Sequence, residues 1–174
     1  VVPYYIATIY YLTGEKAKAL SYAEDRIKKG SGYYDLELRR LVGHGLFEQG
    51  EYTKALPYLE NYAAKKDSLS RIDRYELAYC YFAAGNYPKA IDGFRKLGGK
   101  EDSLAQHSMY LLGDAYLKTN DKQNARNAFL FCARNSSNPK EQEISVFNYG
   151  KLSYELGFPD IALTELQQFL AKYP

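Results

Sequence analysis

The sequence contains no tryptophan, one methionine, two cysteines and two histidines among its 174 residues. The cysteines, Cys80 and Cys132, are too few for a disulfide framework, and neither lies in a Cys-x-x-Cys pair. We expect both to be small buried apolar residues. A metal centre needs three or four converging ligands, and His44 and His107 stand far apart without a cysteine cluster nearby. The sequence therefore predicts no metal and no cofactor.

Long hydrophobic runs and a strong charge bias are also missing. No stretch of 18 apolar residues occurs, so we expect no direct insertion into a membrane. The formal net charge is only +2, which gives no reason to expect a nucleic acid partner. Neither a Gly-x-Ser-x-Gly nucleophile turn nor a glycine-rich phosphate loop is present. These absences indicate a protein without catalytic chemistry of its own.

A short motif recurs along the whole chain. The segments 14–20, 50–56 and 85–91 share the pattern Gly-x-x-x-Lys-Ala followed by leucine or isoleucine, and weaker copies occupy 120–126 and 157–163. The shared alanine recurs at intervals of 35 to 37 residues, at Ala19, Ala55, Ala90, Ala125 and Ala162. A period of this length indicates a repeat architecture.

The spacing and punctuation resemble the tetratricopeptide repeat (TPR) family over nearly the whole chain. That family has a small residue in the middle of each first helix, matched here by Ala7, Gly43, Ala78, Gly113 and Gly150. An aromatic residue follows three places later at Tyr10, Tyr81 and Tyr116, and the closing proline is matched at Pro174. The early tryptophan of the family is absent. The resemblance implies an all-α fold, a right-handed α-α superhelix of about five helix-turn-helix units.

We expect a single repeat domain over residues 1–174, with units near 1–30, 33–66, 68–99, 101–135 and 139–174. The predicted helix pairs are 2–13 with 16–29, 34–49 with 52–65, 69–84 with 87–97, 103–119 with 121–134, and 140–156 with 158–172. Glycine stops helices at little cost because it adopts a left-handed conformation. Ser68 or Ser70, Asp102 or Ser103, and Asn138 are the expected N-caps. The segments 98–99 and 135–139 are expected to be the loosest links.

The last predicted helix keeps an apolar pattern where a terminal unit is usually polar. Its apolar residues are Ile161, Leu163, Leu166, Phe169 and Leu170. We expect the chain to be part of a longer array. The alternative is that a partner, or a second copy of the chain, covers this end.

Tyrosine is unusually abundant, with 19 copies, and many of these rings are not required by the repeat consensus. In the TPR family the first helices line a concave groove that binds protein or peptide partners. Carried over by position, the candidate binding residues are Tyr4, Tyr11, Arg40, His44, Phe47, Tyr75, Tyr79, Phe82, Tyr110, Asp114, Phe147, Lys151 and Tyr154. Tyrosine is enriched at binding hot spots, so the sequence favours a protein- or peptide-binding scaffold.

Other interpretations remain open. The same rings could pack between adjacent first helices instead of meeting a ligand. Aromatic platforms also suit a glycan or a small molecule, although the loops here are short for such a module. Similarity to bacterial TPR proteins of the cell envelope favours a periplasmic location over a cytoplasmic one. The asparagine with which one TPR subtype clamps a chaperone C-terminus is missing at its expected places, so that partner is not expected.

Overall fold

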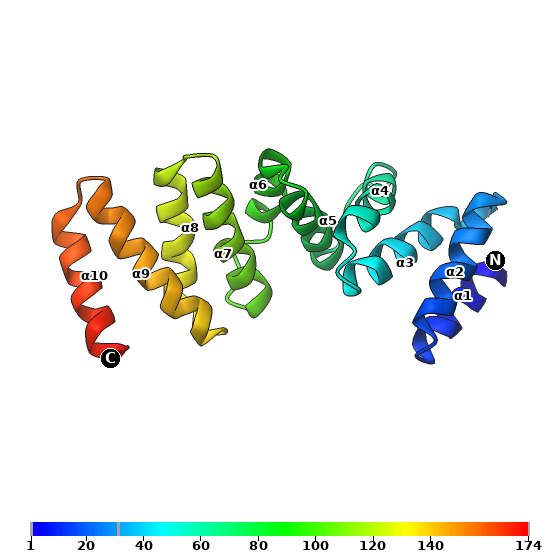
Figure 1. The fold of residues 1–174 in the computed structure, drawn as a ribbon, viewed down its shortest axis with the longest axis horizontal. Coiled ribbons are helices and arrows are strands. Elements are labelled where there is room, and N and C mark those ends of the chain that lie inside the picture. The colour runs from blue at the N-terminus through cyan, green and yellow to red at the C-terminus, as the bar shows by residue number, and fades with distance from the viewer. Residues whose placement is uncertain (1, 31, 174) are drawn as a thin grey trace. The chain divides into compact units, whose positions relative to one another are not determined.

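The computed structural model describes residues 2–30 and 32–173, and these residues form ten α-helices and one short 3-10 helix (Figure 1). Contacts between Cα atoms divide the chain into two compact units, Val1–Gly85 and Asn86–Pro174. We call them the N-terminal and C-terminal units and describe each by itself. The predicted all-α repeat fold is confirmed, because helices pack in TPR-like helix-turn-helix pairs. The superhelix and the single domain over 1–174 stay predictions.

The N-terminal unit contains five α-helices among its described residues. They are α1 (Val2–Leu12), α2 (Lys16–Lys28), α3 (Asp35–Glu48), α4 (Tyr52–Ala63) and α5 (Arg71–Ala83), with the 3-10 helix η1 (Gly32–Tyr34) before α3. Helix α1 pairs with α2, and α3 pairs with α4. The second helix of each pair also packs against the first helix of the next, as α2 does on α3 and α4 on α5. The first helices α1, α3 and α5 touch in turn.

The C-terminal unit repeats this plan. Its helices are α6 (Tyr87–Arg95), α7 (Ser103–Lys118), α8 (Lys122–Arg134), α9 (Pro139–Glu155) and α10 (Pro159–Lys172). Helices α7 and α8 form one pair, and α9 and α10 form the other. Helix α6 packs on α7, and α8 packs on α9. Within each unit, the second helix of a pair therefore packs on its own first helix and on the first helix of the next pair, which is how repeat arrays build a continuous core.

The expected turn chemistry is present. Gly14, Gly50 and Gly157 have φ angles of 88°, 77° and 82°, and Asn120 takes the same left-handed conformation at 60°. Among the alternative N-caps, Ser70, Asp102 and Asn138 are those used, each accepting a backbone N–H three residues on. Pro57 lies inside α4, five residues after the helix begins at Tyr52. Pro174, the expected closing proline, lies outside the described residues.

Small residues in the first helices allow close packing within each pair. A Cβ atom added at Gly113 would lie 2.8 Å from the Phe129 ring, and one at Gly43 would lie 2.7 Å from Leu59 Cδ2. Gly45 has a different role, since a Cβ there would lie 2.5 Å from Leu20 of the preceding pair. Glycine inside a helix costs about 1 kcal/mol relative to alanine, and this close contact offsets that cost.

One expectation about the links between pairs was wrong. Segment 135–139 was expected to be loose, but the fully buried Gln106 of α7 holds it. Its Nε2 donates to the carbonyls of Asn135 and Asn138, at 2.8 and 3.0 Å, and its Oε1 accepts the backbone N–H of Asn138 at 2.6 Å. A single side chain therefore replaces the backbone partners that this turn would otherwise lack.

Candidate functional site

The predicted groove residues of the N-terminal unit lie on its three first helices. Arg40 is exposed and the others are half-buried. They are Tyr4 and Tyr11 on α1, Arg40, His44 and Phe47 on α3, and Tyr75, Tyr79 and Phe82 on α5. We call the face that they form the first-helix surface. It divides into a polar part near α1 and α3 and an aromatic part near α3 and α5.

The polar part contains a hollow of about 260 Å³. Its residues come from α1, α3, the end of α4 and the segment that follows α4. They are Tyr4, Thr8, Tyr11, Glu37, Arg40, Leu41, His44, Tyr62 and Lys66. The guanidinium of Arg40 and the ammonium of Lys66 lie 5.9 and 5.4 Å from the centroid of the Tyr62 ring. The hollow thus combines aromatic faces with basic groups that can donate hydrogen bonds.

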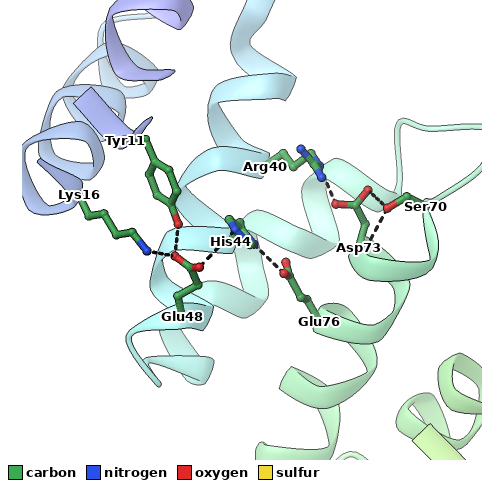
Figure 2. A network of polar contacts seen from close by, with 8 residues as sticks. All are labelled: Tyr11, Lys16, Arg40, His44, Glu48, Ser70, Asp73 and Glu76. Carbon is green, nitrogen blue, oxygen red and sulfur yellow. Dashed lines mark hydrogen bonds and ion pairs between the residues drawn. The ribbon is translucent and has the colours of Figure 1, made fainter. Parts of the chain in front are cut away.

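Arg40 is held in place by a carboxylate on the next first helix. Its Nε lies 2.6 Å from Asp73 Oδ1, and the side chain of Asp73 is buried by α5 and its neighbours (Figure 2). Ser70 Oγ donates to Asp73 Oδ2 at 2.6 Å and accepts the N–H of Asp73 at 3.1 Å. The N-cap of α5 therefore orients the carboxylate that orients Arg40.

His44 is fixed in the same way. Its Nδ1 lies 2.6 Å from Oε1 of the buried Glu76 on α5, and its Nε2 lies 3.8 Å from Oε1 of Glu48 (Figure 2). Glu48 also accepts the hydroxyl of Tyr11 and pairs with Lys16 Nζ at 2.7 Å. A continuous chain of polar contacts thus runs from α1 through α3 to α5.

These contacts shift the acid–base properties of the groups involved. The hydrogen bond to Glu76 raises the pKa of His44. Hydrogen bonds from Lys16 and Tyr11 lower the pKa of Glu48. Burial, followed by the contact with Glu48, raises the pKa of the Tyr11 hydroxyl, which stays a hydrogen-bond donor at neutral pH. The raised pKa favours the protonated, positively charged form of His44, which lies between the carboxylates of Glu48 and Glu76.

The aromatic part is a cluster of rings in mutual contact. The centroid of Phe47 lies 6.1 Å from that of Tyr75 and 5.5 Å from that of Tyr79. Tyr79 also lies 4.9 Å from Tyr52 and 6.4 Å from Phe82. Such pairs contribute about 0.5–1.5 kcal/mol beyond their buried area. The alternative in which rings pack between adjacent first helices therefore describes this part of the surface well.

The predicted groove residues of the C-terminal unit do not repeat this arrangement. Tyr110 lies 6.2 Å from Phe129 of its own pair partner and belongs to the edge of the core. Phe147 lies 5.8 Å from Phe169 of α10. The exposed Lys151 has its Nζ 3.9 Å from Glu155 on the same helix.

Asp114 and Tyr154 are the remaining predicted groove residues of the C-terminal unit. Asp114 is half-buried on α7, and Tyr154 is 70% exposed on α9. The structure thus brings the N-terminal candidates together and leaves those of the C-terminal unit in separate surroundings.

Sequence analysis missed the buried carboxylates. Glu76 stands at the repeat place that Leu41 and Leu111 occupy in other first helices, and Asp73 stands at the place of Leu38. A carboxylate at a place that holds leucine in another repeat is a detectable signal, since buried charges require partners. The C-terminal unit has a related pair, in which His107 Nδ1 lies 2.5 Å from Glu141 Oε1.

The remaining reactive groups are inert. Both cysteines are free and buried, as predicted. Burial raises the pKa of Cys80 to about 12 and raises that of Cys132 as well, so neither thiol forms a thiolate at neutral pH. Within residues 2–30 and 32–173, no three His, Cys, Asp or Glu side chains gather to hold a metal ion. None of the helices in this described part has the length and hydrophobicity to cross a membrane.

Comparisons with known proteins agree with this architecture. The family model described as anaphase-promoting complex, cyclosome, subunit 3 matches residues 48–132. No curated protein matches the sequence. Among solved structures, that of YrrB, described as a TPR protein with an unusual peptide-binding site, has a TM-score of 0.74 at 14% identity. The match covers 100% of this chain and 86% of that chain.

Two structures of MamA are similar as well. One has a TM-score of 0.70 at 17% identity, with 96% of this chain and 94% of that chain covered. The other, from Desulfovibrio magneticus RS-1, has a TM-score of 0.67 at 15% identity, with 98% and 92% covered. Identities this low show the fold alone. Together with the five recurring motifs and the packing of the helix pairs, they show a TPR-like fold of helix-turn-helix repeats.

Proposed function

We propose that the first-helix surface of the N-terminal unit binds a peptide or an extended protein segment. TPR proteins generally bind protein or peptide partners and are typically non-catalytic. The observation that carries the proposal is the hollow between α1 and α3, where Arg40, His44 and Tyr11 are each held by a carboxylate. Side chains already fixed in position lose little entropy when a ligand arrives, which favours binding.

The size of the hollow indicates what it accepts. Whole small-molecule pockets span roughly 300–1,000 Å³. A hollow of about 260 Å³ suits one side chain of a longer ligand better than a complete cofactor or sugar. Tyrosine and arginine are also the residue types that dominate binding energy at interfaces. A peptide that lies along α1 and α3 and places one side chain in the hollow fits both the volume of the hollow and its tyrosine and arginine lining.

A displayed library of random peptides, selected against the chain, tests this proposal. We expect selected peptides to bind Tyr4→Ala and Arg40→Ala at least about tenfold more weakly, as loss of a hot-spot residue does. Lys54→Ala is the matched control, because Lys54 lies on α4 with a side chain 68% exposed. Tyr75 and Tyr79 are less suitable sites for substitution, since their rings pack on Phe47. Unchanged binding by both variants would reject the surface as the binding site.

We also propose a bacterial, periplasmic or envelope-associated location and self-association through the terminal helices. A further proposal is a contribution to binding from Tyr110, Asp114, Phe147, Lys151 and Tyr154. The separate surroundings of these last residues make the C-terminal unit the weaker candidate for peptide binding.

A further inference from the structure

A second hollow, of about 350 Å³, lies beside the second half of α8 in the C-terminal unit. Its residues lie on α8, directly after α8, or just before α7. They are Glu101, Asn127, Leu130, Phe131, Arg134 and Asn135. Whole small-molecule pockets span roughly 300–1,000 Å³. This hollow, which we call the α8 hollow, is therefore large enough for a complete small molecule, whereas the hollow between α1 and α3 is not.

Two residues of the α8 hollow are apolar at places that are polar in the other repeats. Leu130 and Phe131 stand five and six residues after the repeated alanine, Ala125, and both are half-buried. The other repeats have polar pairs at these places, which are Glu24 with Asp25, Glu60 with Asn61, Arg95 with Lys96, and Gln167 with Gln168. The repeat fold therefore does not require apolar residues here. An apolar lining is what small-molecule sites usually have.

Asn135, at the C-terminus of α8, adds a hydrogen-bond donor without an acceptor. The residue is 7% exposed. Its carbonyl accepts from Gln106 at 2.8 Å, its backbone N–H donates to the carbonyl of Cys132 at 3.2 Å, and its Oδ1 accepts the N–H of Ser137 at 3.0 Å. These contacts fix the side-chain amide, yet nothing in the described part of the chain accepts a hydrogen bond from its buried Nδ2. An unmet buried donor is destabilising, and an acceptor atom on a ligand would remove that cost.

The charges of the lining do not favour an anion. Both Nη atoms of Arg134 contact the buried carboxylate of Glu165 on α10, which balances the charge of the guanidinium. Glu101 is exposed and adds a negative charge to the lining. An anionic ligand would gain little from Arg134 and would be repelled by Glu101. The α8 hollow therefore suits a neutral molecule.

We propose that the α8 hollow binds a small neutral molecule with an apolar or aromatic body and one carbonyl oxygen. The body packs on Leu130 and Phe131, and the oxygen accepts a hydrogen bond from Asn135 Nδ2. Burial of the body supplies most of the affinity. The hydrogen bond selects carbonyl compounds over hydrocarbons of similar shape. This site is independent of peptide binding, because the first-helix surface belongs to the N-terminal unit.

NMR titration of the ¹⁵N-labelled chain with acetophenone tests the proposal, because the side-chain NH₂ group of Asn135 gives signals of its own. We expect saturable shifts of these signals and of the backbone amides of residues 127–135. Ethylbenzene has a similar size and shape without the oxygen, and it should bind about tenfold more weakly, as expected for one lost hydrogen bond. Benzoate has the oxygen but carries a negative charge, and it should also bind more weakly than acetophenone.

Two variants separate the two contacts. Phe131→Lys introduces the residue type of Lys96, which stands at the equivalent place, and it should weaken acetophenone binding at least about tenfold. Asn135→Asp keeps an oxygen for the N–H of Ser137 but removes the Nδ2 donor, so it should bind acetophenone no more tightly than ethylbenzene. Gln123→Lys is the matched control, because Gln123 is exposed on α8 outside the hollow. It should bind like the unmodified chain, and circular dichroism should show equal helicity in all variants.

Three results would overturn the proposal. The first is the absence of saturable shifts in residues 127–135 with both acetophenone and cyclohexanone. The second is equal binding of acetophenone and ethylbenzene by the unmodified chain, which would mean that water and not a ligand meets the donor of Asn135. The third is unchanged acetophenone binding by Phe131→Lys.

Discussion

At the scale of single residues, Asp73 and Glu76 set the conformation of the first-helix surface. Each is buried on α5, where an ionised carboxylate without a partner would cost several kcal/mol. Arg40 and His44 on α3 supply the partners, at 2.6 Å in both cases. The same contacts hold the basic side chains at the hollow in fixed positions, so pairing the buried charges also fixes the side chains of the proposed binding surface.

This pairing makes the stability of the N-terminal unit depend on pH. Glu76 on α5 and Glu48 on α3 both raise the pKa of His44 above 6.5, while Arg40 opposes them. Because folding favours the protonated ring, its contribution is complete below about pH 6.5 and is lost as the pH rises through the raised pKa. The contribution is no more than about 1 kcal/mol, because the ring is 34% exposed.

We predict that the difference in free energy of unfolding between the unmodified chain and Glu76→Gln shrinks between about pH 6 and about pH 9. Urea titrations at the two pH values measure this difference. In parallel, an NMR titration should place the pKa of His44 lower in the variant than in the unmodified chain. A difference that is the same at both pH values would show that the pair is not linked to protonation of His44.

At the scale of helices, contact between a glycine and a large side chain fixes the distance within each pair. The Cβ that alanine would add at position 113 lies 2.8 Å from two carbons of the Phe129 ring, which is too close for real atoms. The ring is 2% exposed and cannot move freely. At Gly43 and Gly150 the opposing residues are Leu59 and Leu166, whose branched ends are more flexible.

We predict that Gly113→Ala destabilises the protein by about 1–3 kcal/mol, although alanine is the better helix former. Phe129→Leu alone should also destabilise it, because it leaves a cavity. Combining the two should cost less than the sum of the single changes, since the smaller side chain makes room for the new methyl group. Thermal unfolding of all four proteins measures this coupling. Strictly additive losses would mean that the two residues do not meet.

Helix boundaries and turns were predictable because they depend on local residues. Gly14 and Asn120 end helices through their own backbone preference, and Ser70 caps α5 through its own side chain. The fixed turn at 135–139 was not predictable. It depends on Gln106, which lies about thirty residues earlier in the chain and is recognisable as a partner only once α7 and α9 are side by side. The same holds for the candidate surface: the positions of its residues were predictable, and their partners on other helices were not.

The places of Tyr4, Arg40 and His44 follow from the repeat register. The contacts that hold Arg40 and His44 do not follow from it, because Asp73 and Glu76 belong to the following repeat and appear in the sequence as ordinary charged helix residues. Their only mark in the sequence is that leucine stands at the same places in the preceding repeat, at Leu38 and Leu41. The difference between the two units was also hidden, since Tyr110 and Phe147 satisfy the same register as Tyr4 and Arg40 but contact their own second helices.

At the scale of the whole molecule, the contacts between helices join sequence neighbours within each of the two compact units. Stability in such an array is close to a sum of local terms. A defect in one helix pair should therefore loosen the helices around it more than distant ones. This separates the protein from a globular domain with one shared core, in which a defect lowers protection everywhere.

We predict that Leu59→Ala, which removes a side chain 2% exposed against Gly43, costs about 2–5 kcal/mol locally. Hydrogen exchange should become faster for the amides of α3 and α4 while those of α8 and α9 change little. Exchange followed by mass spectrometry of peptide fragments resolves the two regions. Equal acceleration in both regions would mean that the chain unfolds as one cooperative body.

Hydrogen exchange with a bound peptide tests whether the N-terminal first-helix surface is the binding surface. A peptide selected from the displayed library would be added in excess, and protection would be compared with the free chain. Binding at the hollow predicts slower exchange in residues 4–11, 37–44 and 62–66, with no change in α10. Protection restricted to second helices or to the C-terminal unit would contradict the claim.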